Sequence, residues 1–371
     1  MRIGLLTDNL ARNPWSGVGS YARNLVREWA GQHEVWSIGS LGWDLSLGFA
    51  GHIRVARWQP GWRRRIESRT DVLHCPQPTL ARKYFYELRK PRVVTIHGAE
   101  PFIFAGTPYS HLPDEGTLRL RERSDAVELF IGVSRSGQEQ IAEHYGIAKE
   151  RIVPIYHGID EETFRPPADK TAVRERVRGR YGIPARYLLH VSNYRPRKNG
   201  PRIVAAYRQL WRQGFRDISL VLAGGPRRGF EAVREEIGRT EEGEVIHVGK
   251  ISTQELVELY QGAEVFLFPS LHEGFGFPAI ESMACGVPVV ASTVYSLPEV
   301  TGGGAELVDP ESVEAIAAAT ARLLRDVTIY EERRRAGLAR SREFRWDVSA
   351  REHVEVFQRA IEMFGTKAKA S

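Results

Sequence analysis

Short apolar runs alternate with helical or loop segments along the whole chain. Runs of this kind, bounded by turns, are typical of parallel strands that are buried on both faces of a sheet. The predicted strands of the first half are Ile3–Leu6, Glu34–Ile38, Val72–His74, Val93–Ile96, Leu129–Val133 and Ile152–Ile155. Those of the second half are Tyr187–Val191, Ile218–Ala223, Val245–Val248, Val265–Phe268, Val287–Ala291 and Ala305–Leu307. This rhythm predicts an α/β protein with two doubly wound parallel sheets.

The chain is long enough for two hydrophobic cores. Its 371 residues exceed the length of about 250–300 at which single cores stop growing, and 42% of them are hydrophobic. The proline-rich segment Phe164–Asp169 interrupts the pattern between the two halves and is the predicted linker. We therefore expect an N-terminal domain over residues 1–165 and a C-terminal domain over residues 166–346.

The segment from Glu273 to Glu281 places two carboxylates around a glycine-rich turn. The predicted strand Val265–Phe268 precedes it and a helix opening at Pro278 follows it, so the order is strand, loop, helix. The start of a helix presents unpaired N–H groups and the positive end of the helix dipole, which favours an anionic ligand such as a nucleoside diphosphate. Glu281 is then placed to accept hydrogen bonds from a ribose diol, and Glu273 to face the sugar attached to the phosphates.

This pair of carboxylates resembles the E-x7-E signature of the retaining glycosyltransferases of family 4. The resemblance implies the GT-B architecture, in which two Rossmann-like domains face a central cleft. It further implies that the N-terminal domain binds the acceptor, that the C-terminal domain binds the nucleotide sugar, and that a helix over residues 347–365 crosses back to complete the N-terminal domain. Gly274, Phe275 and Gly276 stand where backbone amides of the family contact the donor sugar and phosphate.

Two motifs of the first half also resemble the family. The segment Pro14–Leu25 holds a glycine loop, which lies beside the donor diphosphate and the acceptor in family 4, although G-x-G alone occurs in many turns. Gly17 and Gly19 would allow close approach of the backbone. His97 ends a predicted strand at the carboxyl edge of the sheet, where ligands bind in open α/β folds. Lone histidines are often structural, but the resemblance favours a catalytic role in binding a sugar hydroxyl or orienting the acceptor.

The loop after the strand Tyr187–Val191 carries the basic candidates. Lys198 occupies the position of the family lysine that neutralises the donor phosphates, a role suited to a compact ammonium charge. The Gly-Arg pair that begins this loop in many relatives is Ser192-Asn193 here, so the usual arginine is missing. Asn193 stands in its place among the expected donor-binding residues, and Arg197 or Arg195 is the candidate replacement for its charge. Simple solvation of the loop is the alternative for each arginine.

The segment His247–Ile251 is similar to the family segment that supports the nucleotide base. Backbone groups of Lys250 and Ile251 are expected to read the edge of the base. No acidic D-x-D pair stands at a suitable strand end, so cationic side chains and helix dipoles are expected to hold the leaving diphosphate. We therefore expect neither a metal nor another cofactor.

The net charge of +6 is modest for this length and too diffuse to indicate nucleic-acid binding. One run, Trp58–Ile66, combines aromatic residues with three consecutive arginines. It fits either peripheral contact with an anionic membrane, where a polyprenyl-linked acceptor is presented, or an exposed helix start. No apolar run reaches the roughly 18 residues of a membrane span, and the N-terminus lacks a signal-peptide pattern. The predicted location is the cytoplasm, with peripheral contact at the inner face of the cytoplasmic membrane as an option.

The resemblance to family 4 implies a retaining glycosyltransferase that moves a sugar from a nucleotide donor to a hydroxyl of a glycan or lipid-linked acceptor in cell-surface polysaccharide synthesis. The residues around P-R-K-N are similar to those of mannosyltransferase-like members, which favours GDP-mannose over UDP-glucose or UDP-N-acetylglucosamine. Two mechanisms stay open: front-face attack, in which the departing phosphate takes the acceptor's proton, and double displacement through Glu273. A sugar-nucleotide epimerase, a phosphorylase-like enzyme and a non-catalytic nucleotide-sugar-binding subunit are the alternative classes.

Overall fold

The computed structural model describes residues 1–8, 10, 17–40, 47–55, 61–107, 109, 112–184, 186–225, 229–239 and 242–370. The chain divides into two units. Unit 1 comprises Met1–Ala105, Ser110–Gly158 and Arg345–Ser371, and unit 2 comprises Gly106–Tyr109 and Ile159–Phe344. Residues 159–165, which the sequence pattern places in the N-terminal domain, lie in unit 2.

Unit 1 is built on a parallel sheet of seven strands in the order β3-β2-β1-β4-β5-β6-β7. The strands are β1 (Arg2–Leu6), β2 (Glu34–Gly39), β3 (Gly51–Arg54), β4 (Val72–Cys75), β5 (Arg92–Ile96), β6 (Leu129–Gly132) and β7 (Ile152–Pro154). Six of these match predicted strands. The sequence pattern missed β3, because this short edge strand buries only Ile53 and therefore lacks an apolar run.

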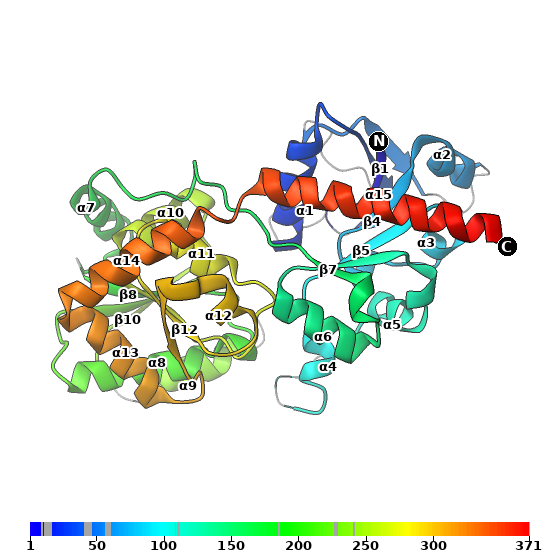
Figure 1. The fold of residues 1–371 in the computed structure, drawn as a ribbon. Helices are drawn as coiled ribbons and strands as arrows, with labels where there is room; N and C mark the ends of the chain where they lie inside the picture. Colours follow the sequence, from blue (N-terminus) through cyan, green and yellow to red (C-terminus); the bar gives the residue numbers. More distant parts are fainter. Residues whose placement is uncertain are drawn as a thin grey trace. The chain divides into compact units, whose positions relative to one another are not determined.

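Helices cover the sheet of unit 1 (Figure 1). They are α1 (Gly17–Trp29), α2 (Trp62–Arg69), α3 (Lys83–Glu87), α4 (Glu100–Ile103), α5 (Glu115–Glu122), α6 (Arg135–Tyr145) and α15 (Trp346–Ala370), with short 3₁₀ turns at Pro78–Leu80, Ser124–Ala126 and Lys149–Arg151. In α1 the buried residues include Tyr21, Leu25 and Trp29, which recur every fourth position and form one apolar face. This face packs on the sheet and on α15.

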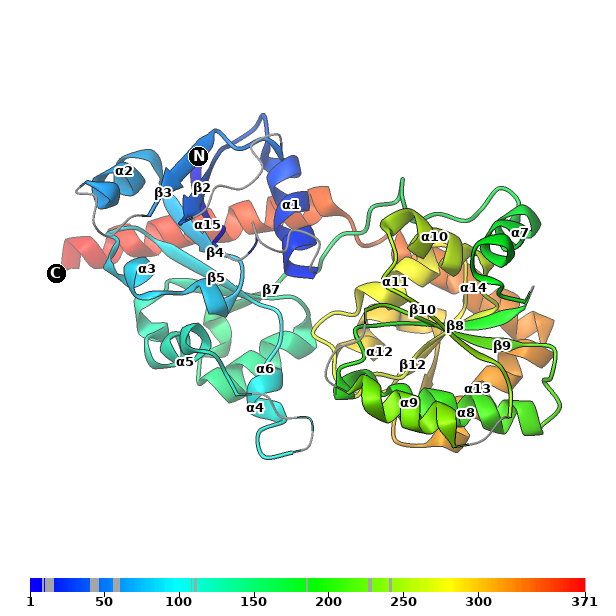
Figure 2. The same cartoon turned by 180° about the vertical axis from the view of Figure 1, so that it is seen from behind.

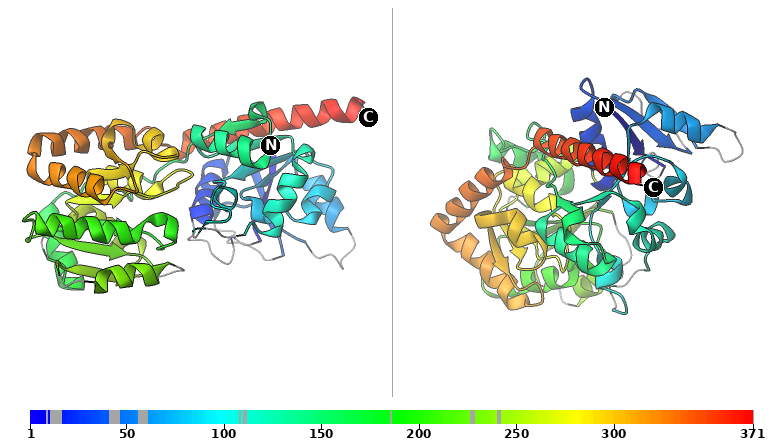
Figure 3. Two further views of the ribbon diagram at one scale, coloured as in Figure 1. Left: turned by 90° about the horizontal axis from the view of Figure 1, so that it is seen from below. Right: turned by 45° about the vertical axis from the view of Figure 1, so that its right-hand side comes forward.

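The helix α15 joins unit 1 through a buried chain of hydrogen bonds. His353 donates from Nδ1 to the carbonyl of Ser349 at 2.7 Å, so its Nε2 accepts from the hydroxyl of Tyr21 at 2.7 Å. Thr95 then donates to the Tyr21 oxygen at 2.8 Å, and His74 Nε2 donates to Thr95 at 3.0 Å. The chain links α15, α1, β5 and β4, and Figures 1 and 3 show α15, drawn in red, crossing α1 and extending across unit 1. The predicted return helix, 347–365, therefore packs in unit 1.

Unit 2 holds a parallel sheet of six strands in the order β10-β9-β8-β11-β12-β13. The strands are β8 (Tyr187–Val191), β9 (Ser219–Ala223), β10 (Val245–Gly249), β11 (Val265–Phe268), β12 (Val289–Ser292) and β13 (Ala305–Val308). All six match predicted strands to within two residues at either end. The two sheets confirm the predicted doubly wound α/β class.

Helices lie on both faces of this second sheet. They are α7 (Lys170–Tyr181), α8 (Gly200–Arg212), α9 (Phe230–Gly238), α10 (Thr253–Gly262), α11 (Phe277–Ala284), α12 (Ser296–Thr301), α13 (Val313–Arg325) and α14 (Val327–Ser341), with 3₁₀ turns at Pro196–Lys198 and Gly302–Gly304. Figures 1 and 2 show α8, α9 and α13 on one face, and α7, α10 and α11 on the other. A hydrophobic core cluster fills the space between the sheet and α8 and α13.

The chain passes from unit 1 to unit 2 at Gly158–Ile159 and returns at Phe344–Arg345. These two segments of chain lie side by side. A Cβ atom on Gly158 would collide with the backbone nitrogen of Trp346 within unit 1. Within unit 2, Ile159 N donates to Phe344 O at 3.0 Å. Glycine at 158 is therefore required by this close approach of the outgoing and returning chain.

Candidate functional site

The strand order of unit 2 reverses between β8 and β11, which are neighbours in the sheet. Ligands of open α/β sheets bind outside the carboxyl ends of the strands at such a switch point. The loop after β8 carries Lys198, and the loop after β11 carries Glu273. A backbone hydrogen bond of 2.8 Å from Leu271 N to Arg197 O joins the two loops. The topology therefore brings the main candidates of the C-terminal half together.

The centre of this site is a cluster of two cations and one carboxylate. Lys198 donates from Nζ to Glu273 Oε1. Arg197 donates from Nη1 to Glu273 Oε2 at 3.2 Å and to the carbonyl of His272 at 2.7 Å. Lys198 is only 8% exposed and Glu273 only 6%. Both oxygens of Glu273 are thus held by buried or half-buried cations from the neighbouring loop.

These cations set the charge of Glu273. Burial by itself would raise the pKa of Glu273, but the charges of Lys198 and Arg197, with the hydrogen bond from Lys198, hold the pKa at about 2. The carboxylate is therefore ionised at neutral pH. Lys198 Nζ also lies 5.1 Å from the ring centroid of Phe268, which gives its charge a second favourable contact.

Backbone contacts fix the glycine loop that follows Glu273. The hydroxyl of Ser296, at the start of α12, donates to the carbonyls of Glu273 at 2.8 Å and Phe275 at 3.0 Å. Phe275 is buried, and its ring packs edge-on against Phe277 and Phe344. Gly276, which precedes α11, has a φ of 111°, where a side chain would be strained. These contacts constrain the backbone on both sides of Gly274.

Glu281 lies one turn further along α11 and has a separate partner. Tyr260 of α10 donates its phenol hydrogen to Glu281 Oε2 at 3.0 Å. Burial raises the pKa of Glu281 to about 7, and the bond from Tyr260 acts in the opposite direction. The two carboxylates of the motif thus differ in environment, because Glu273 is paired with cations and Glu281 with a neutral donor.

The loop between β8 and α8 is shaped by two residues with left-handed backbone. Tyr194 has a φ of 53°, and Asn199, immediately after Lys198, has a φ of 64°. The Asn199 amide donates to the carbonyls of Pro269 at 2.8 Å and Pro310 at 2.6 Å, which ties the loop to the ends of β11 and β13. Asn193 accepts a long bond of 3.4 Å from Arg195 N, so its side chain braces the loop's own backbone.

Lys250 and Ile251 follow β10, two strands away from β8 in the sheet. Lys250 is exposed and Ile251 is half-buried. The backbone nitrogen of Gly224, after β9, donates to Gly249 O at 2.8 Å, so the two loops meet at the same carboxyl edge. The structure places both residues at the edge that carries Lys198.

The candidates of the first half lie in unit 1. Gly17 and Gly19 open α1, and Pro14–Ser16 of the same motif lie outside the described residues. His97 follows β5, and its Nε2 donates to the carbonyl of Pro76 at 2.8 Å. Its ring stacks on His157, with centroids 5.4 Å apart. Burial lowers the pKa of His97 to about 4, so the imidazole is neutral and its Nδ1 is the acceptor.

The buried histidines of unit 1 predict acid sensitivity. Burial lowers the pKa values of His97 and His353 to about 4, and those of His74 and His157 well below 6.5. The unfolded chain therefore binds more protons than the folded chain between about pH 6.5 and 4, and stability is lost as the pH falls through this window. We expect the free energy of unfolding to drop by on the order of 1–2 kcal/mol per histidine at pH 5.

Urea unfolding of the full chain at pH 7 and pH 5 measures this effect. A His353→Gln variant is the control, because it removes one protonatable group and should reduce the difference between the two midpoints. Equal midpoints for the unmodified protein at both pH values would contradict the prediction.

Two family profiles match the chain and together span most of it. Residues 173–340 match the profile "Glycosyl transferases group 1", and residues 15–163 match "Glycosyltransferase Family 4". The chain belongs to glycosyltransferase family 4. The resemblance carried by the E-x7-E motif is confirmed.

Curated relatives of this family 4 protein include mannosyltransferases. O-antigen chain mannosyltransferase B of Escherichia coli is 33% identical over 232 residues, 62% of this chain and 60% of that protein. Serotype-specific mannosyltransferase WbdA of E. coli is 30% identical over 251 residues, 65% of this chain and 29% of that protein. The matches thus span only part of each relative's length. HepE of Anabaena, solved in complex with UDP and glucose, has the same fold, with a TM-score of 0.75 at 16% identity over 96% of this chain and 99% of that chain.

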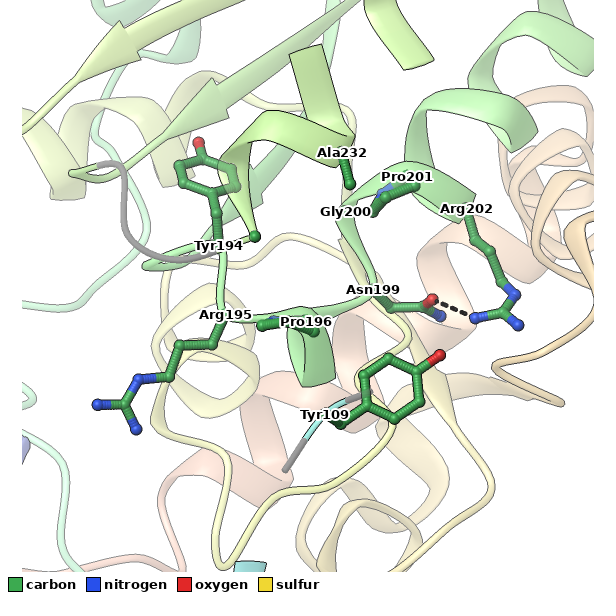
Figure 4. Close-up of a pocket in the computed structure, with 10 residues that line it drawn as sticks. Tyr109, Tyr194, Arg195, Pro196, Asn199, Gly200, Pro201, Arg202 and Ala232 are labelled. Atoms are coloured by element: carbon green, nitrogen blue, oxygen red, sulfur yellow. Dashed lines mark hydrogen bonds between the residues drawn. The ribbon is translucent and has the colours of Figure 1, made fainter. Parts of the chain in front are cut away.

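A pocket of about 310 Å³ borders the β8–α8 loop of the family 4 protein (Figure 4). Its lining residues are Tyr109, Tyr194, Arg195, Pro196, Asn199, Gly200, Pro201, Arg202, Gly229 and Ala232. Figure 4 shows Arg195 pointing away from Asn199, and Arg202 donating to Asn199 Oδ1, a bond of 3.0 Å. The pocket shares its loop with Lys198, but neither Lys198 nor Glu273 is among these residues.

Of the basic and aromatic run Trp58–Ile66, the structure describes only the part from Gly61 onward. The remainder opens α2, as the exposed-helix interpretation expects. Trp62 is buried against Tyr84, with ring centroids 6.0 Å apart, and Arg63 pairs with Glu87. In the described part, this run therefore presents Arg64 and Arg65 at the surface, and its aromatic ring faces inward.

Two further kinds of feature are absent from the described residues. No helix among them has the length and apolar character needed to cross a membrane. No group of three or more histidine, cysteine, aspartate or glutamate residues among them is arranged to hold a metal ion.

Sequence reasoning did not single out the residues that support the site. Tyr260, Ser296 and Asn199 were not among the candidates, yet each contacts or anchors a candidate residue. One signal was available for Asn199, because asparagine is a residue that tolerates left-handed backbone before a helix. Tyr260 has no comparable signal, since a tyrosine on an apolar helix face is usually a core residue.

Proposed function

We propose that the protein is a retaining glycosyltransferase. It would transfer a sugar from a nucleoside diphosphate to a hydroxyl of a glycan or polyprenyl-linked acceptor in the synthesis of a cell-surface polysaccharide. The observation that carries this proposal is the cluster of Lys198, Arg197 and Glu273 at the switch point of unit 2, in a chain of family 4. The cations supply charge for a diphosphate beside the helix α11, and the carboxylate supplies an acceptor for sugar hydroxyls.

GDP-mannose is the favoured donor. The support comes from the two mannosyltransferases of E. coli that are 30% and 33% identical to parts of this chain. A UDP-sugar is the second candidate, because HepE, which has the same fold, was solved with UDP and glucose. The base of the nucleotide would lie against Lys250 and Ile251. The backbone groups of these two residues would select between guanine and uracil.

In the proposed reaction the bond between the sugar's anomeric carbon and the phosphate oxygen breaks. The acceptor oxygen forms the new bond on the same face, and its proton passes to the departing phosphate oxygen. Lys198 and Arg197 would stabilise the charge that grows on the diphosphate, with Asn193 and Gly274 bordering it, and His97 would accept a hydrogen bond from a sugar hydroxyl through Nδ1.

The environment of Glu273 favours this front-face route over double displacement. A nucleophilic carboxylate needs an oxygen directed at the anomeric carbon, but both oxygens of Glu273 are bonded to cations. A charge so strongly stabilised, with a pKa of about 2, is also a weak nucleophile. Glu273 would instead orient the two cations and the sugar.

Incubation with labelled GDP-mannose, UDP-glucose and UDP-N-acetylglucosamine tests the proposal. Slow release of the free nucleoside diphosphate is expected with the true donor, and a thermal-shift panel of GDP, UDP and ADP should show the largest stabilisation with the matching nucleotide. Binding without release in the presence of acceptor extracts would favour a non-catalytic subunit. The absence of any nucleotide-dependent shift would overturn the proposal.

Activity is expected to survive EDTA. In this mechanism cationic side chains and the start of α11 carry the leaving diphosphate, so no step needs a divalent ion. Turnover should be measured with and without chelator, and again after adding manganese or magnesium. Loss of turnover that either metal restores would contradict the metal-independent mechanism.

A polyprenyl-linked acceptor would place the enzyme at the inner face of the cytoplasmic membrane. Arg64 and Arg65 are exposed on α2 and suit anionic headgroups, with each charge contributing about 1 kcal/mol near such a surface. We expect co-sedimentation with vesicles that contain phosphatidylglycerol, and weaker sedimentation for an Arg64→Glu/Arg65→Glu variant. Equal sedimentation of both proteins would rule out this patch as the contact.

A further inference from the structure

Tyr260 contacts the second carboxylate of the motif from another helix. Its hydroxyl lies 3.0 Å from Glu281 Oε2, and the two residues belong to α10 and α11. Tyr260 is fully buried, whereas Glu281 is only half-buried. The contact thus runs from the interior of unit 2 to a carboxylate that reaches the surface.

Aromatic packing fixes the position of the Tyr260 ring. Phe266 of β11 meets it edge-on, with centroids 5.2 Å apart and planes at 78°. Phe164 packs on it at 6.3 Å and 66°. A ring held from two sides has little freedom to move, which favours the contact of its hydroxyl with Glu281.

The direction of the hydrogen bond follows from the chemistry of the pair. Burial, followed by the charge of Glu281, keeps the pKa of Tyr260 well above its usual range, so the phenol stays protonated and donates. Tyr260 of α10 and Cys285, which directly follows α11, are the titratable groups that the described residues bring to this carboxylate. Burial, followed by the charge of Glu281, raises the pKa of Cys285, so the thiol is neutral. The phenol is therefore the group that favours the ionised form of Glu281.

We propose that Tyr260 is a positioning residue for Glu281: it holds Oε2, so that Oε1 is fixed to accept a hydrogen bond from a ribose hydroxyl of the nucleotide. This inference rests on the proposed function, in which Glu281 binds the ribose. The phenol has two effects on the same carboxylate, because it fixes the rotamer and it maintains the charge that the ribose hydroxyls require.

Removal of the phenol oxygen should weaken nucleotide binding and change its pH dependence. We expect Tyr260→Phe to raise the Kd of the preferred nucleoside diphosphate by about tenfold at pH 7. The loss should be larger at pH 6 than at pH 8.5, because without its donor Glu281 is protonated at a higher pH. A merely structural role would lower stability without moving this pH profile.

The matched control is Tyr187→Phe. Tyr187 is also fully buried in unit 2, and its hydroxyl donates to the carbonyl of Leu259 at 2.8 Å, without contact to Glu281. Calorimetric titration of GDP and UDP from pH 6 to pH 8.5 compares the unmodified protein with Tyr260→Phe, Tyr187→Phe and Glu281→Gln. Tyr187→Phe should leave both the Kd and its pH profile within twofold of the unmodified protein.

A second measurement changes the nucleotide and leaves the protein unmodified, so its result does not depend on how a variant folds. The 2′,3′-dideoxy forms of GDP and UDP lack the hydroxyls that Glu281 would hold. The unmodified protein should bind them more weakly, and their Kd should lose the acidic dependence seen with the ribonucleotides. The penalty of Tyr260→Phe should also disappear with the dideoxy ligands.

The possible outcomes distinguish the positioning role of Tyr260 from the proposed binding of ribose by Glu281. Two outcomes would show that the positioning role is wrong while the ribose assignment stands. In the first, Glu281→Gln raises the Kd of the nucleotide but Tyr260→Phe does not. In the second, Tyr260→Phe raises the Kd of ribonucleotides and dideoxynucleotides equally. The ribose assignment itself is wrong if two results occur together: the Glu281→Gln variant binds GDP or UDP as tightly as the unmodified protein does, and the unmodified protein binds the dideoxy nucleotides as tightly as the ribonucleotides.

Discussion

Lys198→Ala is expected to lower kcat by at least about a hundredfold, by analogy with the loss of one preorganised oxyanion donor. The Lys198 ammonium is buried, bonded to Glu273 and set at the carboxyl end of β8, where a leaving diphosphate would gather negative charge. Because that charge is largest in the transition state, kcat should fall more than the affinity for the nucleotide. Steady-state kinetics with saturating donor measures the difference.

Two neighbouring arginines serve as comparisons. Arg197→Ala should also reduce kcat, because Arg197 bonds to Glu273 and occupies the same cluster. Arg195 is exposed, so Arg195→Ala should have a smaller effect. Circular dichroism of each variant should confirm that the fold is intact. A Lys198→Ala enzyme with near-normal kcat would move the charge-stabilising role to another residue.

Gly224→Ala is expected to destabilise unit 2 by about 3–5 kcal/mol. Gly224 follows β9 with a φ of 123°, which side chains rarely adopt, and an added Cβ would collide with the carbonyl oxygen of Ser192. The backbone cannot move aside easily, because Gly224 N bonds to Gly249 O and Ser192 N bonds to Ala223 O. Strain and overlap therefore act on the same residue.

The adjacent glycine is a close control for this variant. A Cβ on Gly225 would meet only the Cβ of Lys250, at 4.0 Å, which is ordinary van der Waals distance. Gly225→Ala should leave the urea midpoint nearly unchanged, whereas Gly224→Ala should lower it strongly. Similar midpoints for the two variants would mean that the β8 and β9 loops can separate without cost.

The sequence predicted the sheets better than it predicted the site. Central strands such as β8 and β11 are continuous apolar runs, so burial on both faces is visible in the residues themselves. The edge strand β3 was missed, because only one of its side chains is buried. Strand ends were approximate, since polar residues can extend a ladder beyond the apolar run.

In the candidate site, the sequence indicated candidate residues but not the contacts between them. The motif indicated Glu273 and Lys198 separately, and it assigned Glu273 to the sugar; nothing in the spacing showed that these two side chains form an ion pair. That contact depends on β8 and β11 being neighbours, a consequence of strand order that apolar runs do not reveal. The roles of Arg197 and Arg195, which the sequence left equivalent, are likewise distinguished by burial and by the bond to Glu273.

The docking of α15 on unit 1 has a consequence for synthesis on the ribosome. The first unit needs His353 and the rest of α15 to close its core, yet all of Ile159–Phe344 is translated in between. At about 5–20 residues per second this delay lasts roughly 10–40 s, and the apolar face around Trp29 stays uncovered meanwhile. The N-terminal half of the nascent chain thus exposes this apolar face until α15 has been made, whereas Ile159–Phe344, which forms almost all of unit 2, can fold before α15 emerges.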